Sequence, residues 1–89
     1  MTGRAFPLHE DSPLKVRWQD YIEERKEVMM GKPVFKGTRL TVEHILNEMA
    51  AGMTKEEILA GYPRITSEHL QAALLYCSAV LSANETIYA

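Results

Sequence analysis

The sequence lacks the residues that cross-link many small folds. Its single cysteine, Cys77, excludes a disulfide within the chain, and no paired Cys or His spacing typical of a structural zinc site is present. A chain of 89 residues is small, and such a chain buries only about 60 to 65% of its unfolded surface on folding. We therefore expect oligomerisation to contribute to its stability.

Long hydrophobic runs are also missing. The longest apolar-rich stretch extends from Ala72 to Leu81, which is far shorter than the roughly 20 residues that a membrane-spanning helix needs. The first residues, MTGRAFPLHEDSP, contain no apolar segment of signal-peptide length. These two absences predict a cytoplasmic protein that has no membrane association.

Basic residues are scarce in the second part of the chain. Residues 1–39 contain 8 of the 10 Lys and Arg and 6 of the 12 acidic residues, so this part has a net charge of +2 and the remainder a net charge of -4. A phosphate backbone would therefore be attracted only by a local basic patch, which a dimer would double.

No arrangement typical of an active site is present. Cys77 lies on an apolar helical stripe, which favours a buried structural thiol, while His9, His44 and His69 are scattered along the chain without obvious carboxylate partners. The segment from Gly31 to Thr38 has Lys36 before a glycine, which is not the order of a phosphate-binding loop. The sequence predicts a protein that is not an enzyme and that needs no metal and no cofactor.

The first half of the chain favours extended structure. Residues 1–13 show no periodicity and are predicted to form a flexible arm. Apolar and polar residues alternate from Leu14 to Trp18, which predicts a strand with Leu14, Val16 and Trp18 facing inward. A second short strand is expected at Val34 and Phe35, within a strand region at 14–40.

Two short helices are predicted next. Thr41 is followed by apolar residues at helical spacing and then by Gly52, which indicates a helix of about ten residues with Thr41 as its N-cap. Thr54 and Glu57 have the spacing of a capping box, so a second helix is expected to begin there and to end near Gly61.

A third helix is predicted after Thr66, followed by a tail at 84–89. Its inward stripe is expected to consist of five residues, namely Leu70, Ala73, Leu74, Cys77 and Leu81. Residues 41–83 would then form a three-helix, homeodomain-like helix-turn-helix domain, and the fold would be mainly α with a short N-terminal strand or hairpin region.

Several short motifs identify a family resemblance. They are Gly-Lys-Pro at 31–33, Gly-Thr-Arg at 37–39, Ala-Gly-Met at 51–53, Glu-Glu-Ile at 56–58 and Tyr-Pro at 62–63. The segment from Gly31 to about Leu81 resembles the small bacterial family of proteins of unknown function numbered 433, although Met30 stands where that family often has a second glycine. The resemblance implies a homeodomain-like fold, dimerisation, and a role as the antitoxin of a type II toxin-antitoxin pair, commonly beside a PIN-like nuclease toxin.

A set of polar residues is a candidate for DNA contact. In a helix-turn-helix the start of the third helix enters the major groove, and a basic residue nearby can hold a phosphate. The candidates are Lys36, Arg39, Arg64, Ser67 and Gln71. Glu68 opposes this function because it repels phosphate, and Arg39 has a second interpretation as an internal ion pair with Glu43 or Glu48. Gly37 is expected to supply a positive-φ turn before Arg39.

The third helix is apolar on nearly all sides, and two short helices with a small hairpin can cover only one of them. The candidate dimer or partner interface comprises Trp18, Ala72, Leu75, Tyr76 and Ala79. Two hypotheses follow: a dimeric antitoxin-like module that binds a cognate toxin, with operator DNA as a candidate second partner, or a structural homo-oligomeric or protein-interaction module that binds no DNA.

Overall fold

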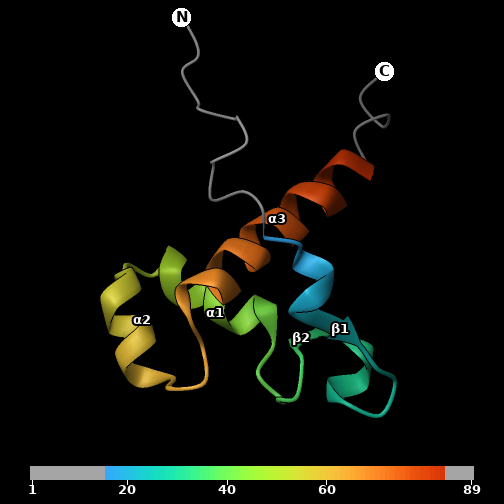
Figure 1. Ribbon diagram of the computed structural model, residues 1–89, viewed down its shortest axis with the longest axis horizontal. Coiled ribbons are helices and arrows are strands. Elements are labelled where there is room, and N and C mark those ends of the chain that lie inside the picture. The colour runs from blue at the N-terminus through green and yellow to red at the C-terminus, as the bar shows by residue number, and fades with distance from the viewer. Residues whose placement is uncertain (1–15, 84–89) are drawn as a thin grey trace, which may run out of the picture.

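The computed structural model describes residues 16–83, which form a small helical fold with one strand pair (Figure 1). The arm and tail predicted at 1–13 and 84–89, together with Leu14 and Lys15, lie outside the described residues. Two short 3-10 turns alternate with two strands before three α-helices: η2 (Trp18–Asp20), β1 (Ile22–Glu24), η3 (Met29–Gly31), β2 (Pro33–Phe35), α1 (Val42–Ala50), α2 (Lys55–Gly61) and α3 (Ser67–Ala83). The predicted mainly helical fold with a short strand region is confirmed.

The first strand lies later in the chain than its predicted position. β1 pairs antiparallel with β2, with Ile22 opposite Phe35, so the strand expected at Val34 and Phe35 is confirmed. The strand predicted from Leu14 to Trp18 is wrong in its described part, because Trp18 begins the η2 turn. Alternating apolar residues over so short a stretch also fit an irregular segment that places every second side chain on a core.

The first two helices begin as their capping residues predict. The Thr41 hydroxyl accepts a hydrogen bond of 3.0 Å from the His44 N–H at the start of α1. At α2 the Glu57 N–H donates to the Thr54 hydroxyl at 3.1 Å, and the Thr54 N–H donates to the Glu57 carboxylate at 2.8 Å. This capping box satisfies two N–H groups that the helix itself leaves without partners.

A histidine completes the cap of α3. The His69 N–H donates weakly to the Thr66 hydroxyl at 3.4 Å, and the Thr66 N–H donates to His69 Nδ1 at 3.0 Å. His69 therefore occupies the position and the role that a glutamate has in an ordinary capping box. The His69 ring is half-buried and meets the rings of Tyr21 and Phe35 edge to face, at 5.0 and 5.6 Å.

The cap gives the fold a dependence on pH. Burial, opposed in part by the charge of Glu68, lowers the pKa of His69 below its ordinary value of 6.5. The unfolded chain therefore takes up a proton before the folded protein does, so this contribution to stability is present above about pH 6.5 and is lost as the pH falls toward the lowered pKa. We expect the urea midpoint to decrease between about pH 7.5 and pH 5.5.

The variant His69→Gln is the control for this pH dependence. A glutamine amide can still accept from the Thr66 N–H, but it does not titrate. The midpoint of this variant should vary less over the same pH range, and an undiminished variation would show that His69 is not the cause.

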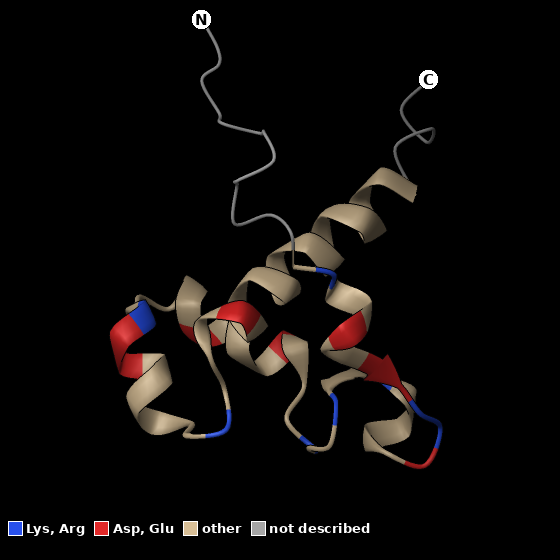
Figure 2. Cartoon of the chain, viewed as in Figure 1, with Lys and Arg blue, Asp and Glu red and all other residues tan. Residues whose placement is uncertain are grey.

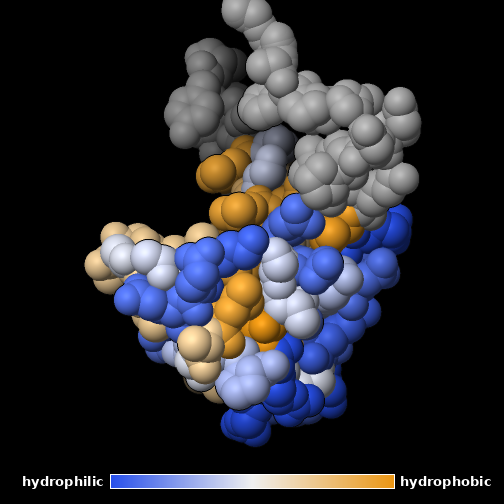
Figure 3. Space-filling model, turned by 60° about the vertical axis from the view of Figure 1, so that its left-hand side comes forward, coloured by the Kyte–Doolittle hydropathy of each residue, from blue (hydrophilic) through white to orange (hydrophobic). Residues whose placement is uncertain are grey.

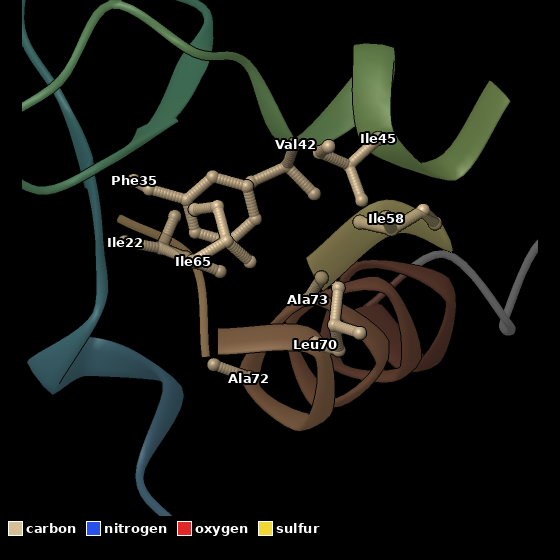
Figure 4. Close-up of a cluster of buried hydrophobic side chains, with 9 residues drawn as sticks. All are labelled: Ile22, Phe35, Val42, Ile45, Ile58, Ile65, Leu70, Ala72 and Ala73. Atoms are coloured by element: carbon tan, nitrogen blue, oxygen red, sulfur yellow. The ribbon is translucent and has the colours of Figure 1, made fainter. Parts of the chain in front are cut away.

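One hydrophobic core joins the sheet to the helices. Its nine buried residues come from the three α-helices, both strands and the α2–α3 turn, and Figure 4 shows them facing a common centre: Ile22, Phe35, Val42, Ile45, Ile58, Ile65, Leu70, Ala72 and Ala73. Phe35 is fully buried. It therefore connects the strand pair to α1 and to the start of α3.

The rotation of α3 differs from its predicted orientation. Leu70 and Ala73 face the core as expected, but Ala72 joins them, while Leu74 and Leu81 are 54% and 69% exposed. When a helix is apolar on nearly all sides, the sequence contains no polar face that would indicate which side points to the core. Small alanines allow a closer approach of this helix to the core than leucines would.

Candidate functional site

The predicted DNA-contacting residues do not form one site. Arg39 and Arg64 line a hollow of about 220 Å³ between the β2–α1 loop and the α2–α3 turn, which we name the arginine hollow. Ser67 and Gln71 line a different hollow of about 170 Å³ beside Lys55. Lys36 is exposed and lines neither of these two hollows.

The arginine hollow is held by a rigid loop. Gly37 has φ of +76°, which confirms the predicted positive-φ turn, and its carbonyl oxygen accepts a hydrogen bond of 3.3 Å from Arg64 Nη2. The Thr38 hydroxyl donates to the Phe35 carbonyl at 2.7 Å and accepts from the Leu40 N–H at 3.0 Å. The Thr38 side chain therefore links the backbone on both sides of the turn, next to Arg39.

Neither predicted acidic partner of Arg39 contacts it. Glu43 instead accepts from Lys32 Nζ at 3.1 Å, and Glu48 is engaged by His44 and Tyr62. Within residues 16–83 no hydrogen bond or ion pair holds the exposed Arg39 guanidinium. Of the two interpretations of Arg39, the internal ion pair with Glu43 or Glu48 is wrong.

A polar cluster that the sequence did not indicate links α1 to the end of α2. The Tyr62 hydroxyl donates to Glu48 Oε2 at 3.1 Å, and His44 Nε2 lies 3.0 Å from that hydroxyl and 3.3 Å from Glu48 Oε2. Desolvation and the Glu48 carboxylate raise the pKa of Tyr62. The earlier inference that His44 has no carboxylate partner is wrong, and the spacing of His44 and Glu48, one helical turn apart, was the signal for it.

The described residues offer no place for a metal ion. Within 16–83 no group of three or more His, Cys, Asp or Glu side chains comes together in a way that could hold one. Cys77 is half-buried and lies beside Leu46 and Asn47 at a shallow hollow between α1 and α3.

The predicted interface residues divide between the interior and the surface. Ala72 is fully buried in the core, so its assignment to an interface is wrong. Trp18 packs edge to face on Tyr76 at 4.9 Å, and the Tyr76 hydroxyl donates to Glu24 Oε2 at 2.6 Å, so both aromatic rings serve internal contacts. Burial and that carboxylate raise the pKa of Tyr76 to about 12. Leu75 is partly exposed.

The last part of α3, residues 78–83, extends away from the body of the molecule, and we call it the second half of α3. Every residue from Ser78 to Ala83 is exposed, among them the predicted interface residue Ala79, and no charged side chain occurs between Leu70 and Ala83. Figure 1 shows this part of the helix extending beyond the other described elements. Figure 3 shows hydrophobic surface in the upper part of the molecule. No helix in the described part of the chain is long and apolar enough to cross a membrane.

The opposite edge of the molecule is basic. Figure 2 shows that most Lys and Arg positions lie in the loops along the lower edge, whereas the acidic positions lie mainly on helices and on β1. Another hollow, of about 440 Å³, lies at this edge, and we name it the methionine hollow. It is lined by Lys26, Glu27, Met29, Met30, Lys32 and Arg39.

Comparison with known proteins identifies the family. The family model described as "Protein of unknown function (DUF433)" matches residues 22–77. The chain belongs to the DUF433 family. The match begins earlier than the resemblance seen in the sequence, at Ile22, and ends at Cys77, so the exposed last turns of α3 follow the matched region.

One solved structure supports this assignment, and one further protein is similar in sequence. The crystal structure of a DUF433 member protein from Anabaena variabilis ATCC 29413 superposes with a TM-score of 0.67 at 28% identity, over 76% of this chain and 67% of that one. An uncharacterised protein, y4eO, from Sinorhizobium fredii is 28% identical over 61 residues, which are 68% of this chain and 28% of that protein. This chain thus matches little more than a quarter of that relative.

Met30 has a strained backbone conformation. Its φ is +58°, a backbone conformation that glycine adopts without strain and other residues do not. Met30→Gly is therefore expected to raise the free energy of unfolding by about 0.5 to 1 kcal/mol, measured by urea denaturation. The reciprocal change, Gly31→Ala, should lower stability although nothing lies within 4 Å of the added Cβ, because φ there is +84°. A loss of stability in Met30→Gly would contradict this explanation.

Proposed function

We propose that this DUF433 protein is a homodimeric protein-binding module of the antitoxin type, and that the second half of α3 forms its subunit interface. One observation carries the proposal: a folded chain presents two uncharged, largely apolar helical turns, Ser78 to Ala83, that none of its described elements covers. Monomeric proteins rarely leave a contiguous apolar surface of this kind in water.

The free energy available at this surface supports a dimer. Within this surface Val80 and Leu81 are 42% and 69% exposed. Taking one such side chain from full exposure to full burial contributes about 1.5 to 3 kcal/mol, so covering the exposed fraction contributes a corresponding share, and a twofold interface buries each of them twice. A small chain without a disulfide gains the most from an interface of this size.

The outer face of α3 favours protein over DNA as its partner. Glu68 is exposed in the first turn, Leu74 is exposed six residues later, and α3 contains no Lys or Arg. A helix that reads the major groove would place its polar and basic side chains there. The outer face of α3 therefore favours a dimer that binds a partner protein over one that binds DNA.

The partner that the family resemblance suggests is a PIN-like nuclease toxin. The test is to co-express the chain with a tagged product of the adjacent reading frame and to purify the complex through that tag. We expect the chain to co-purify, and elution of the tagged protein alone would contradict the antitoxin-type role. A gel shift with the chain's own promoter at low and high salt measures any DNA binding, which must fall steeply with salt if it exists.

A further inference from the structure

The arginine hollow and the methionine hollow are neighbours, because one side chain lines both. Arg39 lines the arginine hollow together with Arg64, and it also lines the methionine hollow together with Lys26 and Lys32. We call this surface the basic strip and define it by six residues: Lys26, Met29, Met30, Lys32, Arg39 and Arg64.

The charge of the basic strip is largely uncompensated. Lys26 and Arg39 make no ion pair or hydrogen bond within residues 16–83, and Arg64 donates only to the neutral carbonyl of Gly37. Lys32 is paired with Glu43 at 3.1 Å, and Glu27 is the one acidic residue that lines either hollow. The strip therefore attracts a ligand that carries several negative charges.

The basic strip also presents apolar surface, which a purely electrostatic site would not need. Met30 is 93% exposed and Met29 is 39% exposed, and both are held at positive φ. The arginine hollow has apolar walls formed by Leu40, Pro63 and Ile65. Methionine side chains adapt readily to the shape of an apolar partner, and a strained backbone conformation at a surface often accompanies a binding role.

We infer that the basic strip binds an acidic segment of a partner protein in which carboxylates alternate with apolar side chains. The carboxylates would meet the guanidinium groups of Arg39 and Arg64, whose planar forks match them, and the apolar side chains would contact Met30 and the walls of the arginine hollow. Nucleic acid shares the negative charge but makes no use of the exposed methionines. The inference rests on the proposed protein-binding function and names the chemistry of its partner.

The test uses a fluorescein-labelled peptide of alternating aspartate and leucine as the probe, with binding followed by fluorescence anisotropy. The unmodified protein should bind it, and Arg39→Gln should weaken binding about tenfold, the size expected for loss of one charge-assisted hydrogen bond. Lys55→Gln removes the same charge from the start of α2, outside the basic strip, and should bind as the unmodified protein does. Equal losses in the two variants would overturn the proposal.

Met30→Gly tests the apolar part without risk to the fold, because glycine suits the backbone at this position. It should weaken binding of the aspartate-leucine peptide about threefold and leave binding of an aspartate-serine peptide unchanged. A lysine-leucine peptide should not bind. The proposal is overturned if that peptide binds equally well, if Met30→Gly has no effect, or if a short DNA duplex binds more tightly with the same dependence on Arg39.

Failure of the basic strip can be told apart from failure of the dimer. The strip lies in loops at the other edge of the molecule from the second half of α3 (Figure 2). The peptide measurement is therefore repeated on Leu81→Glu, a change confined to that half of α3. Peptide binding should persist there whatever the oligomeric state, and its loss would contradict an independent site.

Discussion

The variant Leu81→Glu is expected to sediment as a single chain under conditions in which the unmodified protein is a dimer. Leu81 is 69% exposed in the isolated chain, so a carboxylate there meets water in the monomer and leaves the fold intact. In the proposed dimer the same carboxylate would lose its water without gaining a partner, which costs several kcal/mol and weakens association by about a hundredfold or more. Sedimentation equilibrium measures the change.

Ala60→Glu is the matched control for this prediction. Ala60 is exposed on α2, away from the second half of α3, so the variant gains the same charge at a different surface. It should remain a dimer. A dimer that survives Leu81→Glu, or that is weakened equally by Ala60→Glu, would show that the second half of α3 is not the interface.

Phe35→Ala is expected to lower the free energy of unfolding by about 3 to 5 kcal/mol, which is the usual loss for a fully buried aromatic side chain. Phe35 has no exposed surface and packs among Ile22, Ile65 and the His69 ring, so its removal leaves a cavity where the sheet meets α1 and α3. This is a large part of the roughly 5 to 15 kcal/mol that stabilises a domain. Urea denaturation followed by circular dichroism measures the loss.

Phe35→Leu is the control, since it keeps most of the buried volume. It should cost clearly less than Phe35→Ala, and the difference should reflect the size of the cavity. If Phe35→Ala costs less than about 1 kcal/mol, the core does not depend on this ring, and the position of β2 against the helices must be held in another way.

Local signals in the sequence predicted the helices well. Thr41 and the pair Thr54 and Glu57 are short-range capping signals, so the helix starts that they mark do not depend on the rest of the fold. The cap of α3 shows the limit of this reasoning. Thr66 was recognised, but its partner His69 was not, because histidine seldom occupies the place of the capping glutamate.

Features that depend on tertiary contacts could not be predicted in the same way. The rotation of α3 is set by the fit of Ala72 and Ala73 against the core, and a sequence that is apolar on every side carries no record of it. The alternation around Trp18 suggested a strand, although the ring packs on Tyr76, which lies far along the chain. Only the folded chain brings such residues together.

The candidate site was foreseen in part. Arg39 and Arg64 were singled out from the sequence, and they share the arginine hollow. Ser67 and Gln71 were grouped with them because both begin a predicted recognition helix, yet they line a different hollow. Met29 and Met30 were not among the predicted site residues, because positive φ at methionine has no signal in a single sequence.

The central claim is that the second half of α3, which no described element covers, forms the interface that makes this DUF433 protein a dimer. Light scattering coupled to size-exclusion chromatography, applied to the unmodified protein over a wide concentration range, tests it most directly. We predict a mass of about twice the 10.1 kDa of one chain, falling toward that of one chain only at high dilution. A mass of one chain at every concentration would contradict the claim.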